Sequence, residues 1–83
     1  MKILYFAWLR TTIGCAEETV TPPLEINTAG ALVAWLKDID AKHGDALSRP
    51  ELVRIAVNQE FATPDTPVSM NDEIGLFPPV TGG

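Results

Sequence analysis

The sequence has 83 residues, of which 46% are hydrophobic and 20% are charged, and this balance excludes a disordered or fibrous chain. Six Lys and Arg residues oppose eleven Asp and Glu residues, so the formal net charge of −5 repels nucleic acid and anionic membrane surfaces. We therefore expect one domain, residues 1–83, with a modest core and with neither a nucleic-acid nor a membrane partner.

Residues 2–9 are dense in β-branched and aromatic side chains and predict the first strand. Alternation along this strand places Tyr5 on one face and Leu4, Phe6 and Trp8 on the other, so both faces are apolar. The apolar run is too short for a membrane span or a signal peptide, and we expect a cytoplasmic protein.

A turn is predicted over residues 11–16, followed by a second strand over residues 17–21 that pairs back as a hairpin. Cys15 lies in this turn and is the only cysteine, so no internal disulfide can form. It has no neighbouring His or cation to activate a thiolate, and we expect no catalytic role for it. No Cys/His set has the spacing of a metal site.

Residues 29–43 predict one amphipathic helix, with Thr28 as its N-cap and Gly44 as the residue that ends it. Its apolar side chains recur at three- and four-residue spacing, as in a helix that packs on a sheet. They are Leu32, Trp35, Leu36 and Ile39. His43 is expected near the helix C-terminus, where a cation interacts favourably with the helix dipole.

The segments after this helix are short. Residues 45–52 predict a helical turn that breaks at Pro50, and residues 54–58 alternate as a strand. Asn58 and Gln59 then predict a tight turn into a short edge strand that contains Phe61, because Asn tolerates left-handed backbone angles.

Residues 73–77 predict the last strand, in which Ile74 and Leu76 share one face and Phe77 lies on the other. The order of elements predicts an α+β fold of the ubiquitin-like β-grasp type, with about four to five strands in a mixed sheet and one main helix on one face. The other sheet face would be apolar and uncovered, which indicates a partner-binding surface. The predicted partner-binding residues are Phe6, Phe61 and Phe77.

Residues 78–83 predict a flexible C-terminal tail. Pro78 and Pro79 carry no N–H and cannot extend the strand ladder. Residues 80–83 would reach about 13 Å, at roughly 3.3 to 3.6 Å per residue. Because Gly82 and Gly83 have no side chains, such an arm could enter a narrow channel in another protein, although a frayed terminus is the alternative.

Three stretches of the sequence resemble the small, sulfur-carrying subunit of molybdopterin synthase, also called molybdopterin-converting factor subunit 1. They are residues 6–10 (Phe-Ala-Trp-Leu-Arg), residues 56–59 (Ala-Val-Asn-Gln) and residues 72–83, which run from Asp-Glu-Ile to Phe-Pro-Pro-Val-Thr-Gly-Gly. The resemblance spans the whole chain, and the Phe-Pro-Pro-Val-Thr approach to the two glycines is its specific part. Thr11 departs from the family, which often has Glu at this position.

The resemblance implies a sulfur-transfer reaction at Gly83. An E1-like activating enzyme uses ATP to adenylate the terminal carboxylate, which is ionised at neutral pH and a poor electrophile. A sulfur donor protein then converts the acyl-adenylate to a thiocarboxylate. The tail would insert into the large synthase subunit and donate sulfur to cyclic pyranopterin monophosphate, and two transfers build the molybdopterin dithiolene. The tail-insertion residues are Pro78, Pro79, Val80, Thr81 and Gly82.

The chain is expected to be a cosubstrate and not an enzyme. One His and one Cys supply no set of nucleophile, base and orienting group, so the catalytic groups are expected on the large subunit. No cofactor or metal is expected on this chain, and the resemblance implies a heterotetramer of two large and two small subunits. Two alternatives stay open: a β-grasp sulfur carrier for thiamine, tRNA thiolation or cysteine synthesis, and a non-covalent ubiquitin-like interaction module.

Overall fold

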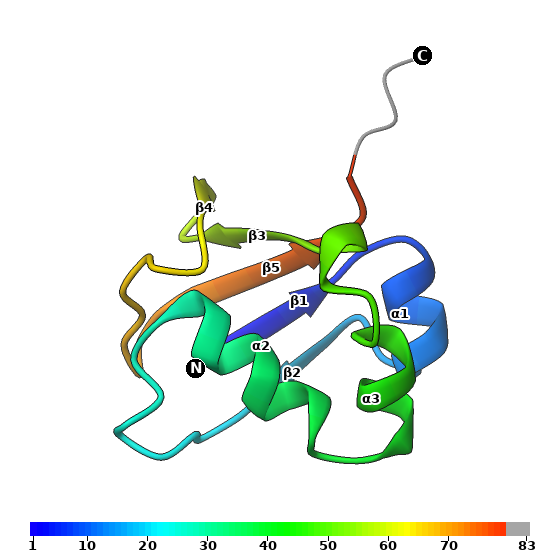
Figure 1. Ribbon diagram of the computed structural model, residues 1–83, viewed down its shortest axis with the longest axis horizontal. Coiled ribbons are helices and arrows are strands. Elements are labelled where there is room, and N and C mark those ends of the chain that lie inside the picture. The colour runs from blue at the N-terminus through cyan, green and yellow to red at the C-terminus, as the bar shows by residue number, and fades with distance from the viewer. Residues whose placement is uncertain (80–83) are drawn as a thin grey trace.

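The computed structural model describes residues 1–79, so the predicted arm of residues 80–83 lies outside the described part of the chain. Within residues 1–79, a five-stranded sheet forms one layer and three α-helices pack against one of its faces (Figure 1). The strands are β1 (Lys2–Tyr5), β2 (Glu17–Thr19), β3 (Arg54–Val57), β4 (Glu60–Ala62) and β5 (Glu73–Phe77). The helices are α1 (Trp8–Ile13), α2 (Ala29–Lys37) and α3 (Ala41–Ala46), and a 3-10 helix, η1, spans Pro50–Leu52.

The last strand, β5, lies in the centre of the sheet, which has the order β2-β1-β5-β3-β4. It is parallel to β1 and antiparallel to β3. The β1–β2 and β3–β4 pairs are antiparallel, and β3 and β4 form a tight hairpin, whereas α1 lies between β1 and β2 in the chain. Because β1 and β5 are parallel, both end at the same end of the sheet, where β3 begins. This mixed sheet with helices on one face confirms the predicted β-grasp.

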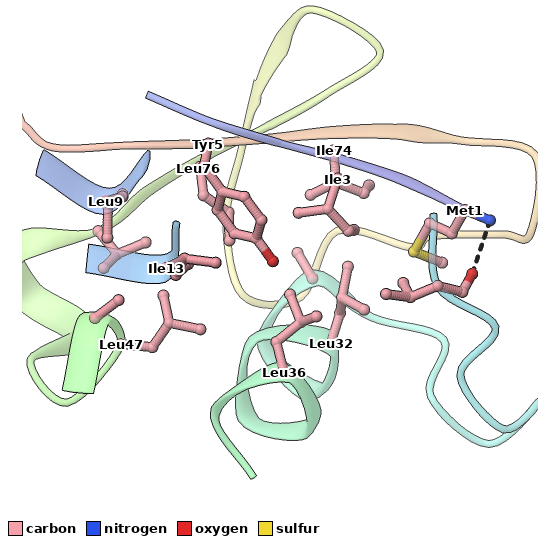
Figure 2. Packing of buried hydrophobic residues seen from close by; sticks show 14 of the residues in the cluster. Met1, Ile3, Tyr5, Leu9, Ile13, Leu32, Leu36, Leu47, Ile74 and Leu76 are labelled. Carbon is pink, nitrogen blue, oxygen red and sulfur yellow. Dashed lines mark hydrogen bonds between the residues drawn. The ribbon is translucent and has the colours of Figure 1, made fainter. Parts of the chain in front are cut away.

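The core lies between the sheet and the helices (Figure 2). Alternation in β1 and β5 directs Ile3, Tyr5, Ile74 and Leu76 toward α2, as predicted. The predicted N-cap of α2 is also confirmed, because the Thr28 side chain accepts a hydrogen bond from a backbone N–H of the first turn at 3.2 Å. The largest fully buried side chains are Tyr5, Ile3, Leu9, Leu32, Leu36, Leu47, Ile74 and Leu76.

The first strand is shorter than predicted. It ends at Tyr5, and α1 occupies part of the segment that was expected to continue the strand and form a turn. The buried residues of α1 are Leu9 and Ile13. They are four residues apart, so they lie on the same face of the helix. Trp8 therefore lies on α1 and not beside Phe6 on the sheet, which corrects the predicted strand face.

Ala7 makes the change from strand to helix. Its φ of 55° and ψ of −133° are disfavoured for a residue with a side chain, and its carbonyl accepts the backbone N–H of Arg10 at 3.1 Å. We expect Ala7→Gly to stabilise the domain by about 1 kcal/mol, since relief of strain of about 1–3 kcal/mol exceeds the extra unfolded-chain entropy of about 0.4–1 kcal/mol. Thermal unfolding should show a rise in midpoint of roughly 4–8 °C, and a fall would contradict a strained Ala7.

The predicted helix over residues 29–43 is divided into α2 and α3. Asp40 is the N-cap of α3, and its carboxylate accepts the backbone N–H of His43 at 2.9 Å. Gly44, which was predicted to end the helix, lies inside α3, and Ile39 lies exposed in the turn between the helices. The capping side chain starts a new helix here, and the periodicity alone did not show it.

The segment of residues 45–52 differs in detail from its prediction. The helical turn is the end of α3, and Pro50 begins η1 rather than only ending a helix, because proline is tolerated at the first position of a helix.

No helix among residues 1–79 has the length and apolar character that crossing a membrane would need.

Candidate partner-binding surface

The sheet face opposite the helices carries a shallow groove of about 460 Å³. Paired strands build it in register: Leu4 and Ala56 lie on either side of Gly75, and Phe61 is the partner of Ala56 on β4. We call this surface the aromatic groove. Its lining residues are Leu4, Phe6, Ala56, Gln59, Phe61, Glu73, Gly75 and Phe77.

The structure brings the three predicted partner-binding residues together in the aromatic groove. The rings of Phe61 and Phe77 have centroids 5.9 Å apart and are tilted by 52°, within the range of an attractive aromatic pair. The Phe6 ring lies over Gly75, because a Cβ at Gly75 would be 3.5 Å from Phe6 Cε2. Phe6 is 48% exposed and Phe61 is 87% exposed. Their role in binding stays a prediction.

A type I′-like turn and a side-chain clamp position Phe61. Asn58 and Gln59 both have positive φ, 51° and 71°, which confirms the predicted tight turn between β3 and β4. The Asn58 side chain donates to the Asp72 carboxylate at 3.0 Å and accepts the backbone N–H of Glu73 at 3.1 Å. These bonds fasten the hairpin to β5, and the hydrogen bond from Asn58 lowers the pKa of Asp72.

The tail begins where the aromatic groove ends. Phe77 is the last residue of β5, and Pro78 and Pro79 follow without joining a strand, as predicted. The other predicted tail-insertion residues, Val80, Thr81 and Gly82, and the predicted reactive residue Gly83 lie outside the described residues.

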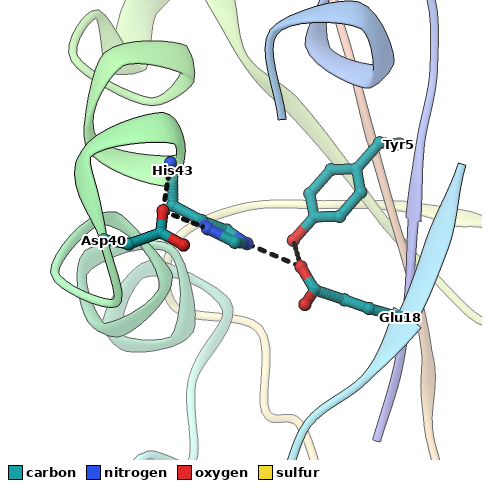
Figure 3. Close-up of polar contacts among 4 residues, drawn as sticks. All are labelled: Tyr5, Glu18, Asp40 and His43. Atoms are coloured by element: carbon teal, nitrogen blue, oxygen red, sulfur yellow. Dashed lines mark hydrogen bonds and ion pairs between the residues drawn. The ribbon is translucent and has the colours of Figure 1, made fainter. Parts of the chain in front are cut away.

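A polar cluster lies on the other side of the sheet (Figure 3). Glu18 Oε2 accepts from the Tyr5 hydroxyl at 2.6 Å and lies 2.6 Å from His43 Nε2, while His43 Nδ1 lies 2.8 Å from Asp40 Oδ1. Since both ring nitrogens face carboxylates, only the protonated ring can donate to both. Burial lowers the pKa of His43, but the hydrogen bonds to Glu18 and Asp40 outweigh it and raise the pKa overall.

The role of His43 was only partly predicted. It does lie in the last turn of α3, but its side chain is 8% exposed and joins α3 to β2 through Glu18. The missed signal was Glu18, whose position in β2, opposite the buried Ile3, turns its carboxylate toward the core. Burial, with the Glu18 hydrogen bond, also raises the pKa of Tyr5, so its hydroxyl stays protonated and keeps donating.

Stability should therefore depend on the charge of His43. Its raised pKa means that the imidazolium stabilises the fold fully below the ordinary value near 6.5, and that this contribution is lost as the pH rises through the raised pKa. We expect His43→Gln to lower the free energy of unfolding by about 2 kcal/mol at pH 6 and by clearly less at pH 9. Urea unfolding at the two pH values measures both changes.

Lys2→Gln is the control, because it removes only an exposed ion pair to Glu17 at 3.2 Å and should change the free energy of unfolding little. Equal losses for His43→Gln at pH 6 and pH 9 would contradict the charged ring.

The described residues offer little for metal or thiol chemistry. Among residues 1–79, no three His, Cys, Asp or Glu side chains are grouped so as to hold a metal ion. Burial and the nearby Glu18 carboxylate raise the pKa of Cys15 and keep its thiol protonated, whereas reactive cysteines need a low pKa.

Comparisons of the sequence with known proteins match it along nearly its whole length. The family model described as the ThiS family matches residues 3–83. A molybdopterin synthase sulfur carrier subunit from Dictyostelium discoideum is 37% identical over 84 residues, covering 99% of this chain and 94% of that protein. The protein of the same name from Escherichia coli (strain K12) is 34% identical over 83 residues, covering 100% of this chain and 99% of that protein.

A solved structure of a related protein has a similar fold. A molybdopterin converting factor, subunit 1, from Pyrococcus furiosus matches with a TM-score of 0.78 and 30% identity, covering 95% of each chain. The resemblance stated from residues 6–10, 56–59 and 72–83 is thereby confirmed. The chain belongs to the ThiS family of β-grasp proteins and, within that family, is related along its full length to molybdopterin synthase sulfur carrier subunits.

Proposed function

We propose that this chain is the sulfur-carrier subunit of a molybdopterin synthase. The observation that carries the proposal is the full-length similarity to proteins of that name, with identities of 37% and 34%. The Gly82-Gly83 sequence, which lies within the matched residues 3–83, supports it further.

In this proposal Gly83, the last residue of the sequence, carries the sulfur. Its carboxylate attacks the α-phosphate of ATP on an E1-like activating enzyme, so that pyrophosphate leaves and an acyl-adenylate forms. A sulfur donor protein then delivers sulfur at the sulfide oxidation level, which attacks the acyl carbon and displaces AMP, and this gives the thiocarboxylate. Activation is needed because a carboxylate ionised at neutral pH is a poor acyl electrophile.

The thiocarboxylate acts in the large synthase subunit. The tail from Pro78 to Gly82 enters the active site of that subunit, where the thiocarboxylate sulfur of Gly83 forms a bond to cyclic pyranopterin monophosphate. Water then cleaves the bond between the Gly83 acyl carbon and the sulfur, so the sulfur stays on the substrate and Gly83 returns to a carboxylate. The large subunit supplies the acid and base groups, and two transfers complete the dithiolene. The chain is thus a non-catalytic cosubstrate in a cytoplasmic assembly of two large and two small subunits.

The aromatic groove is the docking surface in this proposal. It is apolar, it exposes Phe6 and Phe61, and Phe77 joins it directly to the first residue of the tail. An apolar surface of this kind on a small domain is suited to burial against a partner, and buried aromatic side chains contribute strongly to binding. Docking there would bring Pro78 to the partner at the same time.

The test combines the thiocarboxylated chain with a matching large subunit and cyclic pyranopterin monophosphate. We expect a stable complex and formation of molybdopterin. Failure of both, with a large subunit that is active with its own small subunit, would favour a carrier for thiamine, tRNA thiolation or cysteine synthesis.

A further inference from the structure

The end of β5, where the tail begins, lies between β1 and β3. On one side, the backbone N–H of Phe6 donates to β5 at 3.1 Å, and Trp8 follows two residues later at the start of α1. On the other side, Arg54 of β3 is the register partner of Phe77, and Leu52 precedes it in η1. Trp8 and Leu52 therefore lie at the end of the sheet where the tail begins.

Trp8 and Leu52 line a common hollow of about 360 Å³ between α1, α3 and η1. Trp8 is 40% exposed and Leu52 is 36% exposed, and Figure 1 shows α1 and α3 side by side at this end of the sheet. The remaining lining is mostly polar, which is the pattern of an interaction site with an apolar centre and a polar rim. We call this surface the tail-side hollow; its residues are Trp8, Thr12, Asp45, Ala46, Ser48, Arg49 and Leu52.

The backbone of Ala7 separates the two apolar surfaces. Its positive φ of 55° turns the chain so that Phe6 lines the aromatic groove while Trp8 lines the tail-side hollow. A non-glycine residue keeps such angles only where the surrounding structure imposes them, and such residues gather at functional sites. The orientation of Trp8 is thus built into the fold.

The aromatic groove is small for a stable assembly. It is lined by eight residues, whereas a stable interface uses about 20–30 residues on each side. The short tail does not fill that difference, so the interface must extend beyond the groove. Among residues 1–79, the large exposed apolar side chains outside the groove are Trp8 and Leu52 beside the tail, and Leu24 and Ile39 elsewhere.

We propose that the tail-side hollow is a second contact surface for the large synthase subunit, and this inference rests on the proposed function. An apolar side chain of the large subunit fills the space between Trp8 and Leu52, and a carboxylate lies beside Arg49, which forms no ion pair within residues 1–79. The large subunit then contacts the chain on both sides of Pro78, the first residue of the tail, at the aromatic groove and at the tail-side hollow.

The experiment titrates the large subunit with the full-length chain and its variants by calorimetry. Trp8→Ala and Leu52→Ala should each raise the dissociation constant about tenfold, and Arg49→Glu should raise it as well. Leu24→Ala is the matched control, because Leu24 is 86% exposed, lines a different surface and should have no effect. Thermal unfolding of each variant separates loss of binding from loss of fold, and the rate of adenylation by the activating enzyme should stay unchanged.

The outcomes separate this inference from the proposed function. If Phe77→Ala weakens binding while Trp8→Ala, Leu52→Ala and Arg49→Glu bind like the wild type, the second surface does not exist and the proposed function stands. If the Trp8 and Leu52 variants slow adenylation but bind the large subunit normally, the hollow belongs to the activating enzyme and the inference is overturned. A wild-type chain that does not bind the large subunit would overturn the proposed function first.

Discussion

Phe6→Glu is expected to weaken binding to the large subunit by about a hundredfold while the isolated domain stays folded. Phe6 lies over Gly75 in the aromatic groove and is half exposed, so the new carboxylate can be solvated in the free chain. In the complex the same carboxylate would be buried against apolar surface without a partner, which is strongly unfavourable. Calorimetric titration measures the affinity, and urea unfolding measures the stability.

Two further variants test whether the loss of binding is specific to the aromatic groove. Phe77→Ala should weaken binding about tenfold or more, since it removes one ring of the Phe61–Phe77 pair. Leu24→Glu introduces the same charge as Phe6→Glu at an exposed apolar residue away from the groove and should leave the affinity unchanged. Unfolding of the domain by Phe6→Glu, or wild-type binding by it, would show that the sheet face is assigned wrongly.

Deletion of Gly83 is expected to abolish molybdoenzyme activity in cells that depend on this chain. The shortened tail would place its carboxylate about 3.3–3.6 Å away from the position that both the activating enzyme and the large subunit need. Misplacement of a reacting group by about 1 Å already costs roughly a hundredfold in rate. The thermal midpoint should not change, because residues 1–79 hold the whole described core. Normal activity of the truncated chain would favour a non-covalent interaction module.

Part of the fold follows from strand alternation and from a local turn signal. Alternation in residues 73–77 predicted that Ile74 and Leu76 enter the core and that Phe77 lies on the open face, and β5 confirms this. The positive φ values of Asn58 and Gln59 likewise follow from a turn signal in the sequence. The sequence was sufficient to predict the local structure where a residue type has one strong conformational preference.

The errors occur where a single residue overrides a periodic pattern. Ala7 leaves the sheet at an angle that its residue type disfavours, so the continuous apolar run of residues 2–9 hid the start of α1. Asp40 caps a new helix inside an apolar pattern that continues through it. Glu18 and His43 meet across 25 positions of sequence, and no local signal predicts such a pair.

The candidate surface was predictable only in its aromatic residues. Phe6 and Phe77 follow from the alternation of their predicted strands, Phe61 follows from the turn that leads into its strand, and the structure places all three in one groove. Two other features depend on the strand order, in which β5 lies between β1 and β3. They are the hydrogen bond between Asn58 and Asp72 and the shared hollow lined by Trp8 and Leu52. That order is a tertiary property, so the tail-side hollow could not be found from the sequence.

The central claim is that Gly83 is converted to a thiocarboxylate, and the intact mass of the chain tests it most directly. The full-length chain is incubated with ATP, an activating enzyme of this pathway and a sulfur donor, and is then measured by mass spectrometry. Replacement of one carboxylate oxygen by sulfur predicts an increase of about 16 Da that maps to the C-terminal peptide and is absent when ATP is left out. An unchanged mass, with an activating enzyme that modifies its own carrier under the same conditions, would contradict the account.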